Sequence, residues 1–202
     1  MFWTDVDSPL GPLLLTADLD GVLTSVSVPG QKGGRSVQEG WRRDRGPFRA
    51  AVEQLDAYFA ADLAEFRLTV RAEGTAFRTR VWAALDSVPY GSTTTYGEIA
   101  ARVGAPRAAV RAVGGAIGAN PLLIVRPCHR IIGANGALTG YAGGLDRKVR
   151  LLTLEGALPV VQGAPTAPER SLPAPEQALP ALERSLPAPG VIPTPPRPST
   201  HP

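Results

Sequence analysis

Cysteine is almost absent from this chain of 202 residues, which contains one, Cys128. A single cysteine excludes an internal disulfide framework. Histidine is nearly as scarce: His129 follows the cysteine directly, and His201 lies next to the C-terminus. Because Cys and His residues do not recur at the spacing of a zinc site, we expect no metal.

Long apolar runs and N-terminal targeting signals are also missing. No stretch approaches the roughly 20 apolar residues that span a bilayer. Residues 1–7 are acidic, and the apolar region of a secretory signal peptide does not follow them. The sequence therefore predicts a cytoplasmic protein with no membrane partner.

Acidic residues are few in one part of the chain. Residues 75–157 hold ten Lys and Arg against four Asp and Glu, whereas residues 1–74 hold eight against eleven. A basic excess confined to one segment favours contact with a polyanion such as nucleic acid. A solvated basic surface would have the same composition, so charge alone does not decide between them.

Composition also divides the chain. Thirteen of the 21 prolines fall in residues 159–202, where the sequence at 169–175 is repeated at 183–189. Such a Pro- and Ala-rich segment cannot assemble a core, so we expect a disordered tail without a catalytic role. The rest is expected to form two domains, residues 1–73 and 74–158.

Residues 1–73 are expected to be a small α/β scaffold. Alternating apolar residues over 8–28 predict two antiparallel strands joined by a turn. The glycine-rich, charged residues 29–46 indicate a surface loop. Apolar residues at helical spacing predict a helix over 48–61, and a further strand is expected over 65–70. This part has no histidine and only scattered acids, so we expect no chemistry from it.

Residues 74–158 are expected to be mainly helical. Apolar periodicity predicts helices over 75–87, 95–103, 107–117 and 146–154. A run of threonines can cap the second helix, and a glycine-containing turn separates it from the third. Helix, turn and helix in this order outline a helix-turn-helix.

The third predicted helix consists almost entirely of small residues apart from its arginines. Small side chains allow a helix to approach another surface closely, and packing against the core would explain them equally well. Core packing does not readily explain Arg111 in their midst, because a charged residue avoids a dry interior. We therefore expect Arg111 to face a DNA groove.

Cys128 follows a short apolar run, residues 122–125, which predicts a buried strand or a core turn. A thiol with a pKa near ~8.5 needs a neighbouring base or cation to form the thiolate. His129 and Arg130 are both placed to serve. Alternatively, Cys128 is a small core hydrophobe, although flanking arginines argue against a fully dry site.

A second glycine-rich segment follows the cysteine. Gly140, Gly143 and Gly144 surround Tyr141, and their backbone can approach a ligand closely. A flexible connector is the alternative interpretation.

Taken together, these motifs closely resemble the O6-alkylguanine-DNA alkyltransferases over residues 8–156. The features shared with that family are the helix-turn-helix with its arginine, Asn120, the run Pro-Cys128-His129-Arg130, the Gly-Tyr-Ala-Gly-Gly loop and a terminal Leu-Glu155-Gly. The resemblance implies an N-terminal ribonuclease-H-like α/β domain and a C-terminal winged-helix-like catalytic domain.

The activity that the resemblance implies is DNA repair by direct reversal. One molecule transfers an alkyl group irreversibly from O6 of guanine to Cys128, acts once and needs no cofactor. The partner would be double-stranded DNA, bound by a monomer through the minor groove, with the damaged nucleotide flipped out of the stack. The sequence leaves open whether O4-alkylthymine is also a substrate.

The resemblance also implies a role for each matching residue. Cys128 accepts the alkyl group, His129 takes the thiol proton through a water, Glu155 orients the imidazole and Asn120 fixes the turn. The residues matching the substrate-binding positions are Tyr96, Arg111, Ile131, Tyr141, Ala142 and Lys148. Those matching the DNA-binding positions are Arg107, Arg111, Ala112 and Gly114.

Three positions depart from the family pattern. Arg126 stands where an apolar residue is usual, Val110 replaces an alanine, and Ala142 replaces a common serine. These departures concern the rate and the alkyl preference more than the reaction class.

Two other functions compete with this interpretation. A Cys-His hydrolase also needs a thiolate and an orienting acid, but it has no use for a helix-turn-helix. A protein that recognises alkylated bases without repairing them would need the helix-turn-helix, but relatives of that kind usually lack the cysteine.

Overall fold

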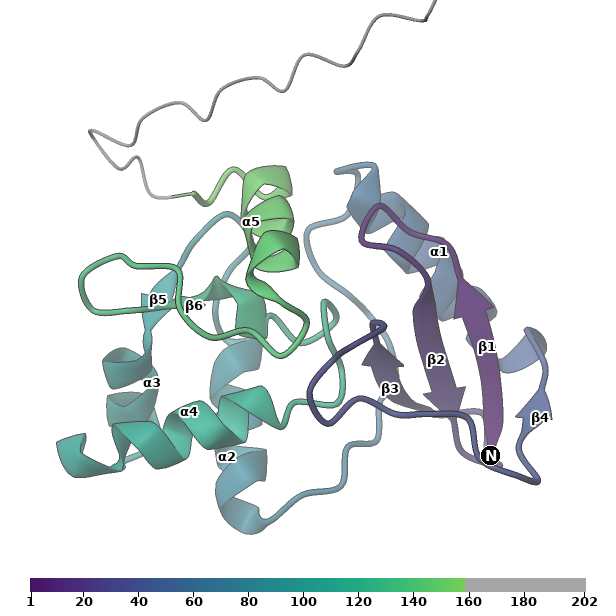
Figure 1. Cartoon of the computed structure of the whole chain (residues 1–202), viewed down its shortest axis with the longest axis horizontal. Coiled ribbons are helices and arrows are strands. Elements are labelled where there is room, and N and C mark those ends of the chain that lie inside the picture. The colour runs from purple at the N-terminus through teal and green to yellow at the C-terminus, as the bar shows by residue number, and fades with distance from the viewer. Residues whose placement is uncertain (159–202) are drawn as a thin grey trace, which may run out of the picture. The chain divides into compact units, whose positions relative to one another are not determined.

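The computed structural model describes residues 1–158 (Figure 1), so the expected tail lies outside the described residues. Those residues belong to one compact unit in which a strand-rich half precedes a helical half. Within this part of the chain, none of the helices combines the length and the apolar character needed to cross a membrane.

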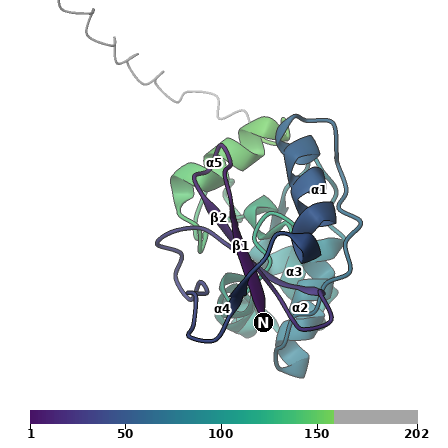
Figure 2. The same cartoon turned by 90° about the vertical axis from the view of Figure 1, so that its right-hand side faces the viewer.

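The strand-rich half is a four-stranded sheet with the order β3-β2-β1-β4. β1 (Phe2–Val6), β2 (Leu13–Ala17) and β3 (Leu23–Ser27) pair in antiparallel fashion, and β4 (Arg42–Arg43) joins β1 in parallel. α1 (Arg49–Phe59) runs alongside the strands (Figure 2) and buries Ala51, Leu55 and Tyr58. Leucines of β2 and α1 therefore share one apolar core.

Three features of this half differ from the sequence-based expectation. β1 was not predicted, and β4 lies inside the predicted loop over 29–46. Residues 65–70 do not form a strand: only Val70 makes an isolated bridge, to Leu23. The alternating apolar residues of this segment are partly buried against the core, so their pattern reflects burial rather than a strand ladder.

The helical half confirms the four predicted helices. They are α2 (Ala76–Asp86), α3 (Tyr96–Arg102), α4 (Val110–Gly118), which a short 3-10 turn precedes, and α5 (Leu145–Leu154). A two-stranded parallel pair, β5 (Thr94–Thr95) with β6 (Ile131–Ile132), leads into α3.

The start of α3 is set by a capping box. The Thr95 hydroxyl accepts from the Glu98 amide at 3.2 Å, and the Glu98 carboxylate accepts from the Thr95 amide at 2.8 Å. These two bonds satisfy amides that a helix end leaves unpaired. The predicted threonine cap is thus confirmed, and it places Tyr96 at the first residue of the helix.

Backbone hydrogen bonds join the two halves next to the cysteine. The Val26 amide of β3 donates to the Pro121 carbonyl at 2.9 Å, and the Leu123 amide donates back to the Val26 carbonyl at 3.1 Å. The sheet therefore supports the chain segment that leads to Cys128.

Candidate functional site

Residues 122–125 form a core turn, which decides between the two structures expected from the sequence. Leu122, Leu123 and Ile124 are buried, and the Arg126 amide donates to the Leu122 carbonyl at 2.9 Å. Ile124 has φ of 72°, a conformation that β-branched residues rarely adopt. A single 3-10 turn, Cys128–Arg130, follows Pro127.

Asn120 holds this turn from the end of α4. Its Nδ2 lies 3.2 Å from Cys128 Sγ, 3.1 Å from the Arg126 carbonyl and 3.3 Å from the Leu122 carbonyl. Its Oδ1 accepts from the Leu122 amide at 3.1 Å. One buried side chain thus binds the turn at both ends and donates to the sulfur.

The Cys128 thiol is buried, and burial raises its pKa to about 11. The hydrogen bond from Asn120 and the charge of Lys148 lower this pKa, but by less than burial raises it. Cys128 is therefore protonated at neutral pH, and it needs a base to take its proton.

Glu155 is the centre of the neighbouring hydrogen-bond network. Its carboxylate accepts from His129 Nε2 at 2.8 Å and from Arg130 Nε and Nη2 at 2.8 and 2.9 Å. The Tyr58 hydroxyl donates to Glu155 Oε1 at 2.6 Å, and this is the oxygen that also binds His129. Burial alone would raise the pKa of Glu155, but these donors lower it to about 2.

This network determines which nitrogen of His129 can accept a proton. Because Glu155 is ionised and can only accept, His129 Nε2 must carry a proton. Nδ1 is buried and has no partner among residues 1–158. Burial also lowers the pKa of His129, so the ring is neutral at pH 7 and Nδ1 offers a free lone pair. Arg130, which the sequence offered as a cation for the sulfur, binds Glu155 instead.

A pocket of about 530 Å³ opens at Cys128. Its wall consists of one face of α4, the glycine-rich loop after the cysteine and part of the predicted surface loop. The lining residues are Lys32, Gly33, Tyr96, Gly114, Gly115, Ile117, Gly118, Ala119, Cys128, Gly140, Tyr141 and Ala142.

The loop around Tyr141 requires its glycines. A Cβ at Gly140, where φ is 58°, would lie 2.9 Å from the Tyr96 hydroxyl, and one at Gly143 would lie 2.7 Å from the Tyr141 ring. The Tyr96 hydroxyl donates to the Thr139 and Gly140 carbonyls at 3.0 and 3.2 Å. The segment is thus tied into the pocket wall rather than being a free connector.

The amides of Tyr141 and Ala142 donate to no acceptor within the described residues, whereas both carbonyls are engaged. The Ala142 carbonyl accepts from the Lys32 amide at 3.2 Å, and the Tyr141 carbonyl accepts from the Gly144 amide at 3.0 Å. Two backbone donors therefore remain available to a ligand at this wall.

Lys148 supports the same loop from the interior. Its buried ammonium donates to the carbonyls of Ile131, Thr139 and Gly140, the last two at 2.8 and 3.3 Å. Burial lowers its pKa to about 8. Lys148 and Ile131 are not lining residues of the pocket, so in this structure they hold its wall in place.

The residues expected to contact DNA lie on and before α4. Arg107, Arg111 and Ala112 are exposed, and Gly114 lines the pocket. Their contact with DNA remains a prediction.

Sequence reasoning missed three residues near this site. Tyr58 reaches Glu155 from the half expected to be inert, and Lys32 and Gly33 line the pocket from a predicted surface loop. The glycines of that loop were the only signal for a close approach. No local signal marked Tyr58.

The unusual Arg126 is bound by two residues of α2, and its charge also lowers the pKa of Cys128. Its Nε lies 2.9 Å from Asp86 Oδ1, and its guanidinium lies 5.5 Å from the Trp82 ring centroid. It joins the cysteine turn to α2.

Comparison with known proteins matches both halves of the chain. A family model for the 6-O-methylguanine DNA methyltransferase ribonuclease-like domain matches residues 1–72, and one for the DNA binding domain of the same proteins matches residues 76–157.

Within residues 1–158, His, Cys, Asp and Glu do not form a group of three or more that could hold a metal ion.

Two of the similar proteins carry the same name. A methylated-DNA--protein-cysteine methyltransferase of Mycolicibacterium paratuberculosis is 55% identical over 150 residues, which are 74% of this chain and 89% of that protein. Its namesake in Methanosarcina acetivorans is 48% identical over 157 residues, 78% of this chain and 99% of the relative. The crystal structure of Mycobacterium tuberculosis OGT in complex with DNA matches with a TM-score of 0.71 and 49% identity, covering 77% of this chain and 93% of that one.

Proposed function

The chain belongs to the 6-O-methylguanine DNA methyltransferase family, and on this basis we propose that Cys128 accepts the alkyl group from O6 of guanine in DNA. The protein repairs DNA by direct reversal, as a methylated-DNA--protein-cysteine methyltransferase. The observation that carries this function is the position of the only cysteine, which lies in a pocket beside a neutral histidine held by an ionised carboxylate.

In the proposed reaction, His129 Nδ1, which has no hydrogen-bond partner among residues 1–158, takes the proton of the Cys128 thiol through a water. The sulfur then attacks the alkyl carbon, so that a C–S bond forms as the C–O6 bond breaks. The electron pair of the broken bond stays with the guanine, and the amides of Tyr141 and Ala142 would donate to O6 as negative charge develops there. The thioether product does not hydrolyse, so each molecule acts once.

DNA contact is proposed for the exposed residues of α4 and the turn before it. We assign Arg107 and Ala112 to the DNA backbone and Arg111 to the stack, which it would enter from the minor groove as the nucleotide leaves. Tyr96 and Gly114 line the pocket that would receive the flipped base. These roles correspond to a winged-helix-like domain, and the helix-turn-helix outline and the basic excess of this half support them.

A single molecule should suffice for the reaction. Cys128, His129, Asn120 and Glu155 come from one chain and are joined by hydrogen bonds directly or through the cysteine turn. We therefore propose that the protein acts as a monomer.

Intact mass spectrometry tests the reaction. The protein is mixed with an equimolar duplex that carries one O6-methylguanine, and a Cys128→Ser variant is the control. We expect a gain of about 14 Da, one methylene, on Cys128 that saturates at one per molecule. Binding of the lesion without modification would instead support a protein that recognises alkylated bases without repairing them.

A further inference from the structure

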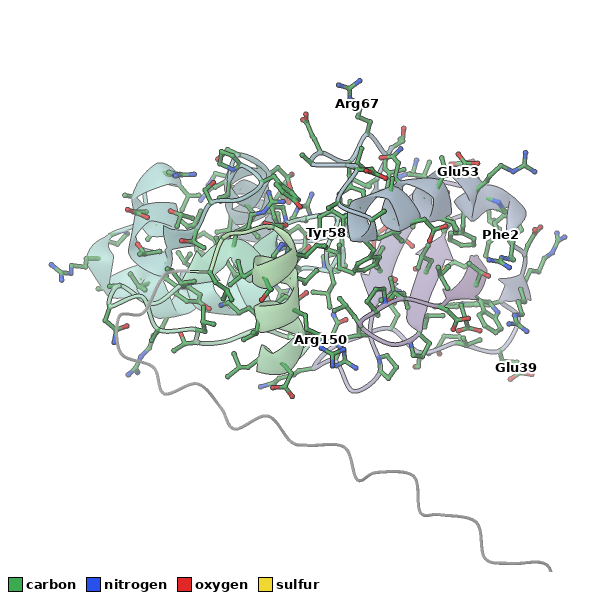
Figure 3. The ribbon with its side chains drawn as sticks, turned by 90° about the horizontal axis from the view of Figure 1, so that it is seen from above. Phe2, Glu39, Glu53, Tyr58, Arg67 and Arg150 are labelled. Atoms are coloured by element: carbon green, nitrogen blue, oxygen red, sulfur yellow. The ribbon has the colours of Figure 1, made fainter. Side chains whose placement is uncertain are left out.

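Tyr58 connects the N-terminal half of the molecule directly to the catalytic network. It lies on α1, is fully buried and donates to Glu155 Oε1 at 2.6 Å across 97 positions of sequence. Figure 3 labels Tyr58 between the strand-rich and helical halves. The ring is held by neighbouring aromatic rings, with centroid distances of 5.2 Å to Phe66 and 6.1 Å to Tyr90.

We propose that Tyr58 is a positioning residue for the alkyl transfer, which fixes Glu155 and thereby the orientation and basicity of His129. The inference rests on the proposed function, because it assigns His129 as the base for Cys128. It gives the ribonuclease-like half a part in the chemistry of the other half.

The geometry gives Tyr58 two effects on His129. Glu155 Oε1 accepts from Tyr58, from His129 Nε2 and from Arg130 Nη2, so the tyrosine and the histidine share one oxygen. The rigid tyrosine limits rotation of the carboxylate and so keeps His129 Nδ1 free. It also withdraws negative charge from Oε1, which reduces the stabilisation of a protonated His129.

Several other charged or titratable groups surround this pair. Arg130 binds both carboxylate oxygens, the ring of Tyr141 lies 6.4 Å from that of His129, and the Arg130 guanidinium lies 5.7 Å from the ring centroid of Tyr90. The charges of Lys148 and Arg130 also oppose protonation of His129. All of these groups remain when Tyr58 is changed to Phe, so that substitution isolates one hydroxyl.

The sign of the expected shift follows from the shared oxygen. Without the hydroxyl, Oε1 carries more charge and holds a protonated His129 more firmly, so the pKa of His129 rises. Because protonated His129 cannot accept the thiol proton, the acid limb of the rate profile should move to higher pH. In Tyr58→Phe we expect the acid limb to shift by roughly 0.5 pH unit. The transfer rate at pH 7 should fall about five-fold, because Glu155 loses the hydrogen bond that fixes its position.

Single-turnover methyl transfer, followed by mass spectrometry from pH 5.5 to 9, is the test. Tyr90→Phe is the matched control, because the Tyr90 hydroxyl donates to the Leu154 carbonyl at 3.2 Å and not to Glu155. The control should keep the wild-type profile, and both variants should bind the duplex with wild-type affinity. Melting temperatures of both variants separate a kinetic effect from unfolding.

A double-mutant cycle tests whether Tyr58 acts through Glu155. In a Glu155→Gln background, Tyr58→Phe should have less than a two-fold effect on the rate. The inference would be overturned by an unchanged pH–rate profile in Tyr58→Phe, or by an equal effect of Tyr58→Phe in the wild-type and Glu155→Gln backgrounds. Methyl transfer by the wild type would leave the proposed function standing in either case. Absence of transfer by the wild type would instead refute the proposed function.

Discussion

At the scale of single residues, burial and reactivity oppose each other at Cys128. Burial raises the pKa of the thiol to about 11 and leaves little thiolate at neutral pH, although Cys128 lines a pocket. Asn120 partly offsets burial through its hydrogen bond to Sγ. We infer that reactivity depends on proton transfer to His129 during the reaction rather than on a standing thiolate.

Removal of the Asn120 amide should therefore affect both chemistry and folding. Asn120→Ala leaves the buried Leu122 amide without its acceptor and should lower the free energy of unfolding by about 2 to 3 kcal/mol. It should raise the pKa of Cys128 further and slow methyl transfer at least about ten-fold. Denaturant unfolding and single-turnover rates measure these effects. Asn135→Ala, at an exposed turn, is the control, and a wild-type transfer rate in Asn120→Ala would contradict the prediction.

Glu155 should make part of the stability depend on acid pH. Its folded-state pKa, about 2, lies below the ordinary value of 4.5, so its contribution is complete above pH 4.5 and is lost as the pH falls towards 2. Glu155→Gln should be less stable at pH 7 but should lose on the order of 2 to 3 kcal/mol less between pH 5 and 2. Urea unfolding at several pH values measures this, with exposed Glu53→Gln as the control. Equal acid sensitivity of wild type and Glu155→Gln would contradict it.

The residues proposed to carry the chemistry lie in local sequence motifs. Cys128 and His129 are adjacent, and Asn120 and Glu155 stand in runs typical of the family. In the structure, Asn120 hydrogen-bonds Cys128, and Glu155 hydrogen-bonds His129. Tyr58 was not predictable, because its position on α1 indicates only a core residue and its partner is 97 positions away.

At the scale of elements, apolar residues at helical spacing predicted structure more reliably than the short alternation of apolar and polar residues over 65–70. The four helices of the second half are as predicted because each buries one apolar stripe. β4 has only two residues, which is too short for any pattern. Residues 65–70 alternate like a strand, but only Val70 finds a bridge partner.

The exposed arginines of α4 and its preceding turn should determine the salt dependence of DNA binding. If Arg107 contacts a phosphate, Arg107→Ala should reduce the slope of log K against log salt by about 1. Arg111→Ala should slow methyl transfer more than it weakens binding, because the Arg111 side chain is proposed to fill the space that the flipped base leaves. Fluorescence anisotropy at several salt concentrations and single-turnover rates measure the two effects. Arg49→Ala, on α1, is the control, and an unchanged slope in Arg107→Ala would remove this residue from the interface.

At the scale of the whole molecule, the two halves are in contact, although each half matches a different family model. Val26 hydrogen-bonds the segment before Cys128, Arg147 Nε donates to the Leu10 carbonyl at 2.8 Å, and Tyr58 binds Glu155. Each of these links leaves a polar group unpaired if the halves part, and buried residues of both halves share one apolar cluster.

The halves should therefore unfold together. Calorimetry of the chain ending at residue 158 should give one transition whose van't Hoff and calorimetric enthalpies agree. The fragment 74–158 lacks the sheet that supports the cysteine turn and the tyrosine that donates to Glu155. It should therefore transfer methyl groups at least about ten-fold more slowly than the chain ending at residue 158. This corresponds to a loss of roughly 1.4 kcal/mol in transition-state stabilisation. Two separate unfolding transitions, or full activity of the fragment, would contradict this prediction. Either result would mean that the N-terminal half stabilises neither the cysteine turn nor Glu155.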